Sequence, residues 1–167
     1  KARENQLKID WETSEIHKPI QMGVQTIQDF DISKLIDFID WSSFFRSWYL
    51  HVKYPNILND AIVGEQATLL FADAQELLNR IINEKVLKAK AVFGLFKANT
   101  INTDDIEFFY GEEENLKGTF LTLRQQLKKK EGASNFALAD FIAPKETGKQ
   151  DYMGCFCVST GFGTQEL

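Results

Sequence analysis

Hydrophobic and polar positions follow a helical period in two stretches of the first half of the chain. Between residues 64 and 84, apolar side chains recur at helical spacing, and Glu76 and Arg80 form an i, i+4 pair on the polar face. A shorter apolar stripe consists of Trp41, Phe44, Phe45 and Trp48. The pattern predicts a long helix over 64–84 and a short helix that begins after Asp40. Upstream, Asp31 or Ser33 is expected to cap a brief helix through Ile36.

After residue 90 the period changes to that of strands. Residues 91–96 are apolar on both faces, which is typical of a central strand covered on both sides. Further strands are predicted over 105–110, 119–123 and 152–158, and the short apolar stretch 137–143 ends at a proline. Helices followed by strands predict an α+β fold with a mostly antiparallel, twisted sheet.

The length of 167 residues fits one domain, or one and a fraction. Residues 1–30 have little periodicity and are interpreted as a meandering arm that enters from an upstream module, and residues 31–167 as the domain itself. Because the first residue is Lys1 rather than methionine, we expect the chain to be a piece of a longer protein.

Composition excludes several classes of function. With 19 basic and 24 acidic residues the net charge is −5, which argues against a generally basic nucleic-acid surface. No apolar run approaches the roughly 20 residues that span a bilayer. Cys155 and Cys157 lie two positions apart in a predicted strand, at or beyond the limit of disulfide geometry. They are predicted to be reduced thiols that face the core of a cytoplasmic protein.

Established catalytic and metal-binding motifs are missing from the sequence. There is no P-loop, no H-E-x-x-H and no G-x-S-x-G. A metal site would have to combine His17, His51, Cys155 and Cys157 from distant segments, so no metal ligands are assigned. Gly161–Gly163 lacks the third glycine of a dinucleotide-binding turn and is interpreted as a hairpin or loop, and Lys128–Lys130 as a solvated surface.

Asp40 is the residue with the most suggestive surroundings. Its neighbours Phe38, Ile39, Trp41 and Phe44 are apolar, and a buried carboxylate must be capped, paired or used. One interpretation is an N-cap of the helix that begins at Trp41. The other is a receptor for a ligand ammonium group, beside aromatic faces suited to a cation. The residues alone favour the cap.

Six segments in chain order resemble the activation domain of cobalamin-dependent methionine synthase. Upstream of them, NQLKIDW (5–11) is similar to the segment that leads into this domain. The six segments are FIDWSSFF (38–45), KYP with IL (53–58), GLFKAN (94–99), LRQQ (123–126), LADFIAP (138–144) and DYMG (151–154).

The resemblance implies a C-shaped α+β domain within a large cytoplasmic methyltransferase that makes methionine from homocysteine and methyltetrahydrofolate. Such a domain binds S-adenosylmethionine for the reductive methylation of cob(II)alamin, and the cobalamin is held by another module of the same polypeptide. The implied electron donor is flavodoxin or a diflavin reductase, and zinc belongs only to the parent enzyme. No nucleic acid or membrane is implied as a partner.

Carried onto this sequence, the resemblance assigns Asp40 to the S-adenosylmethionine site, as acceptor from the α-amino group of the ligand. No catalytic residue is assigned. The family's R-P-A-x-G-Y-P-A-C segment does not occur before Leu167, so the chain is expected to be the N-terminal part of the domain, without catalytic activity of its own.

Two other hypotheses stand beside this one. The first is a non-catalytic interaction or structural domain without a small-molecule ligand, in which every aromatic side chain belongs to the core. The second is a free-standing small-molecule methyltransferase, which the absence of a glycine-rich strand–turn–helix near the N-terminus argues against.

Overall fold

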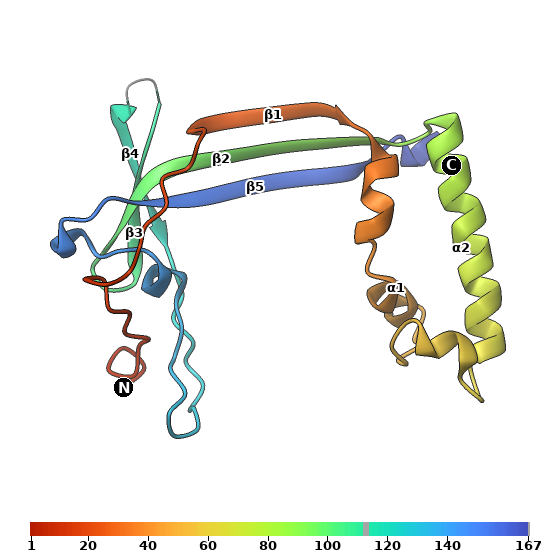
Figure 1. The fold of residues 1–167 in the computed structure, drawn as a ribbon, viewed down its shortest axis with the longest axis horizontal. Coiled ribbons are helices and arrows are strands. Elements are labelled where there is room, and N and C mark those ends of the chain that lie inside the picture. Colours follow the sequence, from red (N-terminus) through yellow and green to blue (C-terminus); the bar gives the residue numbers. More distant parts are fainter. Residues whose placement is uncertain (112–113, 167) are drawn as a thin grey trace. The chain divides into compact units, whose positions relative to one another are not determined.

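The described residues form two α-helices, five strands and several short 3-10 helices (Figure 1). The computed structural model describes residues 1–111 and 114–166. The helices are α1 (Trp41–Ser47) and α2 (Gly64–Glu84), and the strands are β1 (Gly23–Phe30), β2 (Lys88–Ile101), β3 (Asp105–Tyr110), β4 (Leu116–Leu121) and β5 (Asp151–Phe162). Short 3-10 helices are η1 (Ile32–Phe38), η2 (Asn56–Asn59), η4 (Leu138–Phe141), η5 (Lys145–Thr147) and η6 (Thr164–Glu166). The predicted α+β class is confirmed, as are the helices predicted over 64–84 and after Asp40. The brief helix predicted through Ile36 is the 3-10 helix η1, which Asp31 caps.

The five strands form one sheet in the order β1-β2-β3-β4, and β5 also pairs with β2. β2 and β3 are antiparallel, with Ile101 opposite Asp105, and the turn between them places Asn102 and Thr103 at positive φ. β3 and β4 are also antiparallel. The prediction of a central strand is therefore confirmed for β2, which lies between β1 and β5 (Figure 1). That it is covered on both faces is wrong, because Val92 is 43% exposed.

The described part of the chain divides into two compact units. One consists of residues 1–26 and 92–157, and the other of residues 27–91 and 158–167. The boundary predicted at residue 30, between an entry arm and the domain itself, is a different division of the chain and stays a prediction. None of the described helices is long and apolar enough to cross a membrane.

The unit of residues 1–26 and 92–157 has a small apolar core beside a polar one. Ala98, Ile106 and Ala139 are buried together against Phe108, Ile142 and Met153. Next to them, the guanidinium group of Arg124 donates to both oxygens of Asp140, at 2.6 and 2.7 Å, and to Asp104 Oδ1 at 2.8 Å. It also donates to the carbonyl oxygen of Asn135 at 2.7 Å, so the buried charge is fully paired.

The unit of residues 27–91 and 158–167 has an aromatic core. Phe45 and Ile57 are fully buried, and Leu50 and Ala67 join them. Asp60 accepts hydrogen bonds from the amides of Ile62 and Val63, at 2.9 and 3.1 Å, and this turn leads the chain into α2. The partly buried side chains that pack against this core are Trp41, Phe44, Val52, Tyr54, Leu58, Val63, Leu70 and Phe71.

Several expectations about the strands need correction. Residues 23–30, interpreted as part of a meandering arm, form β1, whose half-buried positions include Gln25 as well as Ile27 and therefore give no clear apolar alternation. Cys155 and Cys157 are free thiols as expected but are exposed, because every residue of β5 from 154 to 162 is exposed. Residues 161 and 162 continue β5 instead of forming a hairpin or loop.

The polar face of α2 also differs from the sequence expectation. Arg80 pairs with Glu84, with 3.2 Å between Nε and Oε2, and not with Glu76. Both spacings place the acid one turn from the arginine, so sequence spacing does not choose between them.

Candidate functional site

Asp40 lies immediately before α1 and caps it. Its Oδ1 accepts a hydrogen bond from the Ser43 amide at 3.2 Å, and its Oδ2 accepts one from the Ser43 hydroxyl at 2.5 Å. These two bonds from Ser43, the hydroxyl first, lower the pKa of Asp40, so the side chain is a carboxylate at neutral pH. A carboxylate has about four acceptor positions, which leaves room for a further donor.

Asp40 also lines a cavity of about 530 Å³, within the usual range of small-molecule sites. Among the described residues, Asp37 and Asp40 are the charged ones that line it, and no lysine, arginine or histidine does. The cavity is therefore complementary to a cation. Its lining consists of Ile36, Asp37, Ile39, Asp40, Trp41, Ser42, Tyr54, Phe71 and Gln75.

Three aromatic rings form part of the wall of this cavity. Trp41 meets Phe71 of α2 edge to face, with ring centroids 4.9 Å apart, and Phe71 meets Tyr54 at 5.5 Å. The Tyr54 amide donates to the Ser42 hydroxyl at 3.2 Å, which ties its segment to the first turn of α1. The face of an aromatic ring is electron-rich and attracts a cation, so rings beside two carboxylates are compatible with a cationic ligand.

The sequence identified some of these residues and missed others. Ile39 and Trp41 line the cavity as neighbours of Asp40, whereas Phe44 packs against the core and Phe38 is 82% exposed. The contributions of Tyr54, Phe71 and Gln75 were missed, although Phe71 belongs to the predicted apolar stripe of α2 and Tyr54 to the KYP segment. The helical periodicity identified Phe71 as an apolar position, but periodicity does not indicate which core aromatic residues border a cavity.

Among the described residues, the remaining candidates of the sequence analysis do not form a metal site. His17 is exposed and lies 3.8 Å from Glu15, and His51 is exposed as well. Within residues 1–111 and 114–166, no group of three or more His, Cys, Asp or Glu side chains is arranged to hold a metal ion. Lys128 and Lys130 are exposed, as expected of a solvated surface.

Comparison with known proteins identifies the family of this chain and a similar solved structure. The model of the vitamin B12-dependent methionine synthase activation domain matches residues 31–167. This chain belongs to that family. Among solved structures, a crystal structure of the MetH reactivation domain bound to AdoHcy is similar, with 40% sequence identity and a TM-score of 0.86.

That alignment covers 99% of this chain and 50% of the solved chain. The chain thus spans about half the length of the reactivation domain structure that it matches. Membership in the activation-domain family and the α+β fold of the MetH reactivation domain follow for this chain.

Proposed function

We propose that this chain is the part of a methionine synthase reactivation domain that holds S-adenosylmethionine by its cationic end, at Asp40. The observation that carries the proposal is the cavity with two carboxylates, no basic side chain and three aromatic rings. The solved relative bound to AdoHcy supports it, because AdoHcy is the demethylated form of that ligand.

In this proposal each residue has a defined part. Asp40 accepts a charge-assisted hydrogen bond from the ligand ammonium group while it keeps its two bonds from Ser43. Asp37 adds negative potential, and the faces of Trp41, Tyr54 and Phe71 favour a positive charge and exclude water from one side. Such contacts hold and orient the methyl donor.

The parent enzyme supplies the rest of the proposed reaction. Cobalamin, held by another module of the same polypeptide, is the acceptor of the methyl group in reductive methylation. Flavodoxin or a diflavin reductase supplies the electron that this reaction consumes. The zinc of the parent enzyme has no part in it, and the assignment to the cytoplasm belongs to the same proposal.

The test separates the cap from the ligand contact. Asp40→Asn keeps an acceptor for the Ser43 amide but removes the charge, so helix α1 should persist. In the parent enzyme we expect S-adenosylmethionine binding, measured by calorimetry, to weaken at least about tenfold, the loss of one charge-assisted bond. Reductive methylation should fall with it, while turnover from methyltetrahydrofolate stays close to wild type.

Unchanged S-adenosylmethionine binding in Asp40→Asn would contradict the assignment of this residue, and equal loss of both activities would contradict the assignment of the domain.

A second candidate function is a structural domain without a ligand. It is favoured by the fact that both Asp40 oxygens already accept bonds from Ser43. It predicts no heat when S-adenosylmethionine is added to the parent enzyme.

A further inference from the structure

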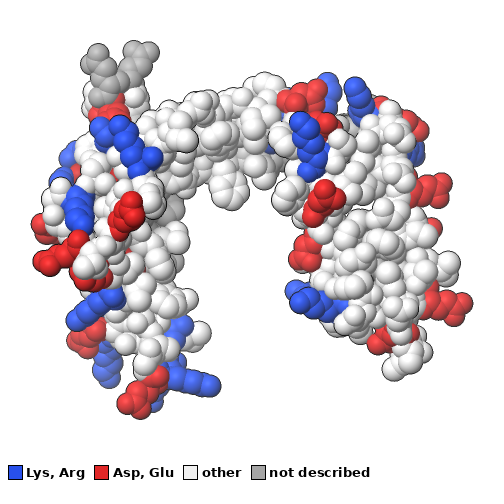
Figure 2. Space-filling model, in the orientation of Figure 1, with Lys and Arg blue, Asp and Glu red and all other residues white. Residues whose placement is uncertain are grey.

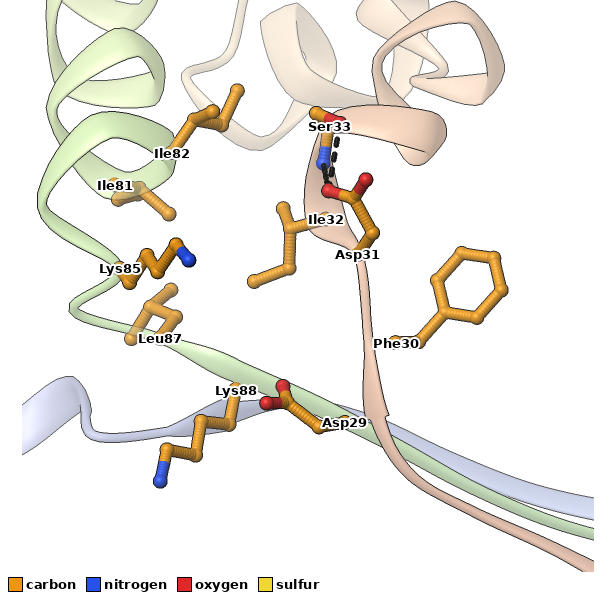
Figure 3. Close-up of a pocket in the computed structure, with 10 residues that line it drawn as sticks. All are labelled: Asp29, Phe30, Asp31, Ile32, Ser33, Ile81, Ile82, Lys85, Leu87 and Lys88. Carbon is orange, nitrogen blue, oxygen red and sulfur yellow. Dashed lines mark hydrogen bonds between the residues drawn. The ribbon is translucent and has the colours of Figure 1, made fainter.

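A second cavity lies in the unit of residues 27–91 and 158–167, between the start of η1 and the end of α2 (Figure 3). Its volume is about 390 Å³, and it shares no lining residue with the Asp40 cavity. Residues 29–33 form one wall. The other wall consists of Ile81, Ile82, Lys85, Leu87 and Lys88.

Part of the surface of this cavity is apolar. Four aliphatic side chains, each half-buried, approach it from both walls: Ile32, Ile81, Ile82 and Leu87. Surface of this kind gains free energy when an apolar group displaces water from it, at about 25 cal/mol per Å². The cavity therefore suits a ligand with an aliphatic portion.

Side chains of opposite charge line this cavity from its two walls. Asp29 and Asp31 are on one wall, and Lys85 and Lys88 on the other. Among the described residues, none of the four forms an ion pair within 4.0 Å. Figure 3 shows the ammonium group of Lys85 directed from the end of α2 into the space that faces η1.

Asp31 has one oxygen available for a ligand. Its Oδ1 accepts from the Ser33 amide at 3.0 Å and from the Ser33 hydroxyl at 2.7 Å, and its Oδ2 accepts from no donor in the described part of the chain. The hydrogen bonds from Ser33, the hydroxyl first, lower the pKa of Asp31, so this oxygen carries negative charge at neutral pH.

Lys85 occupies a backbone position that favours a different residue. It is the C-cap of α2 and has φ of 53°, in the left-handed region where glycine is preferred. A lysine at this position costs backbone strain and contributes an ammonium group at the mouth of the cavity. This makes it possible to remove the charge without loss of fold stability.

We propose that this cavity binds a small zwitterion with an apolar side chain, that is, an aliphatic α-amino acid. The ammonium group of the ligand binds Asp31, with Asp29 near it, and the carboxylate binds Lys85. The aliphatic side chain lies against Ile32, Ile81, Ile82 and Leu87. This site is independent of the function proposed above, because it uses a different cavity and other residues.

The probe is L-leucine, titrated into the 167-residue chain and followed by amide chemical shifts and by calorimetry. We expect shifts confined to the lining residues. N-acetyl-L-leucine, which lacks the ammonium group, and L-leucinamide, which lacks the carboxylate, should each bind at least about tenfold more weakly. L-glutamate should bind weakly as well, because its side-chain charge would enter the apolar part of the cavity.

Two variants and a control make the test independent of folding. Lys85→Gly removes the ammonium group and relieves the backbone, so its melting temperature should equal or exceed that of the wild type while leucine binding falls at least about tenfold. Asp31→Asn keeps the cap but loses the charge and should weaken binding similarly. Asp73→Asn, on the exposed face of α2 and outside the cavity, should bind as the wild type does.

The proposal is overturned if L-leucine causes no shifts at the lining residues, or if it binds Lys85→Gly as tightly as the wild type. Equal binding of L-leucine and N-acetyl-L-leucine would also overturn it, because the ammonium contact would then be absent.

Discussion

In the unit of residues 1–26 and 92–157 a charged side chain, Arg124, is buried, whereas in the unit of residues 27–91 and 158–167 the largest fully buried side chain is that of Phe45. The first interior combines a small apolar core with directional bonds among polar residues, and the second is held by contacts among aromatic rings. A polar interior stabilises only while every partner is present, whereas an apolar interior loses free energy in proportion to the volume removed. The two units should therefore respond differently to substitution.

Charged side chains are unevenly distributed over the face of the molecule drawn in Figure 2. Figure 2 shows positive and negative groups interspersed over the helices and loops, and an uncharged band over the middle of β1, β2 and β5. The sequence agrees, since β5 has no charged residue after Asp151. The exposed apolar side chains of this strand include Phe156, Val158 and Phe162.

The largest loss of stability is expected from Phe45→Ala. Phe45 is fully buried and lies 5.3 Å from the ring of Phe44 and 6.3 Å from that of Tyr54. Truncation removes apolar burial and leaves a cavity, which costs about 3–5 kcal/mol. Urea unfolding measures the change. A loss below about 1 kcal/mol would show that the aromatic interior collapses around the gap, contrary to the close packing assumed here.

Arg124→Met is expected to cost slightly less, about 3 kcal/mol, for the opposite reason. The methionine fills similar space, but Asp104 and Asp140 remain, with side chains 12% and 3% exposed, and lose their main partner. The matched control is Lys97→Met, which removes an ion pair to Glu114 whose side chains are about one third exposed. That control should cost much less than Arg124→Met, because exposed ion pairs contribute little to stability. If Arg124→Met and Lys97→Met lost the same free energy of unfolding, burial of the Arg124 ion pairs would not be the cause of the larger expected loss.

These two interiors also explain how much of the structure the sequence could predict. Periodicity located α1 and α2 and the aromatic stripe because the apolar face of a helix repeats along the chain. The polar interior has no such repeat. Arg3 and Asp104 are 101 residues apart and Arg124 and Asp140 are 16 apart, so only the folded chain brings them together.

The family motifs of this unit have a physical explanation in the same network. LRQQ contains Arg124, LADFIAP contains Asp140, and DYMG contains Asp151, which accepts from the Ala143 amide at 2.8 Å. These motifs carried the resemblance, and the structure shows that their polar residues bond to one another. FIDWSSFF contains Asp40, which caps α1 and borders a cavity, so both interpretations of that residue remain compatible with its geometry. Its ligand contact stays a prediction.

Acid should weaken the polar unit through Glu107 and Asp104. The ion pair with Lys145 and a second with Lys117 lower the pKa of Glu107 from its ordinary value of 4.5, against the opposing effect of burial. Burial raises the pKa of Asp104, but hydrogen bonds from Arg3 and Arg124 outweigh it and lower the pKa from 3.8. Both carboxylates are therefore more acidic in the folded state than in the unfolded state.

It follows that their contribution to stability is fully present above about pH 4.5 and is lost as the pH falls through the folded-state pKa values. In Glu107→Gln the free energy of unfolding should fall less steeply as the pH drops below 4.5. The same variant should be less stable than the wild type at pH 7. Urea unfolding at a series of pH values measures this. An unchanged slope in Glu107→Gln would mean that this carboxylate does not couple protonation to folding.

The smallest expected effect concerns the surface of α2 and decides between two partners of Arg80. The structure pairs Arg80 with Glu84, and both side chains are about half exposed. A double-mutant cycle with Arg80→Ala and Glu84→Gln should give a coupling energy of about 0.3 kcal/mol, and the cycle with Glu76→Gln a coupling of about zero. Glu84→Gln alone should change stability very little, because Glu84 is the last residue of α2, where negative charge opposes the helix dipole. The gain from removing that charge offsets the lost ion pair, so only the cycle isolates the pair. A larger coupling with Glu76 than with Glu84 would favour the partner that sequence spacing suggested.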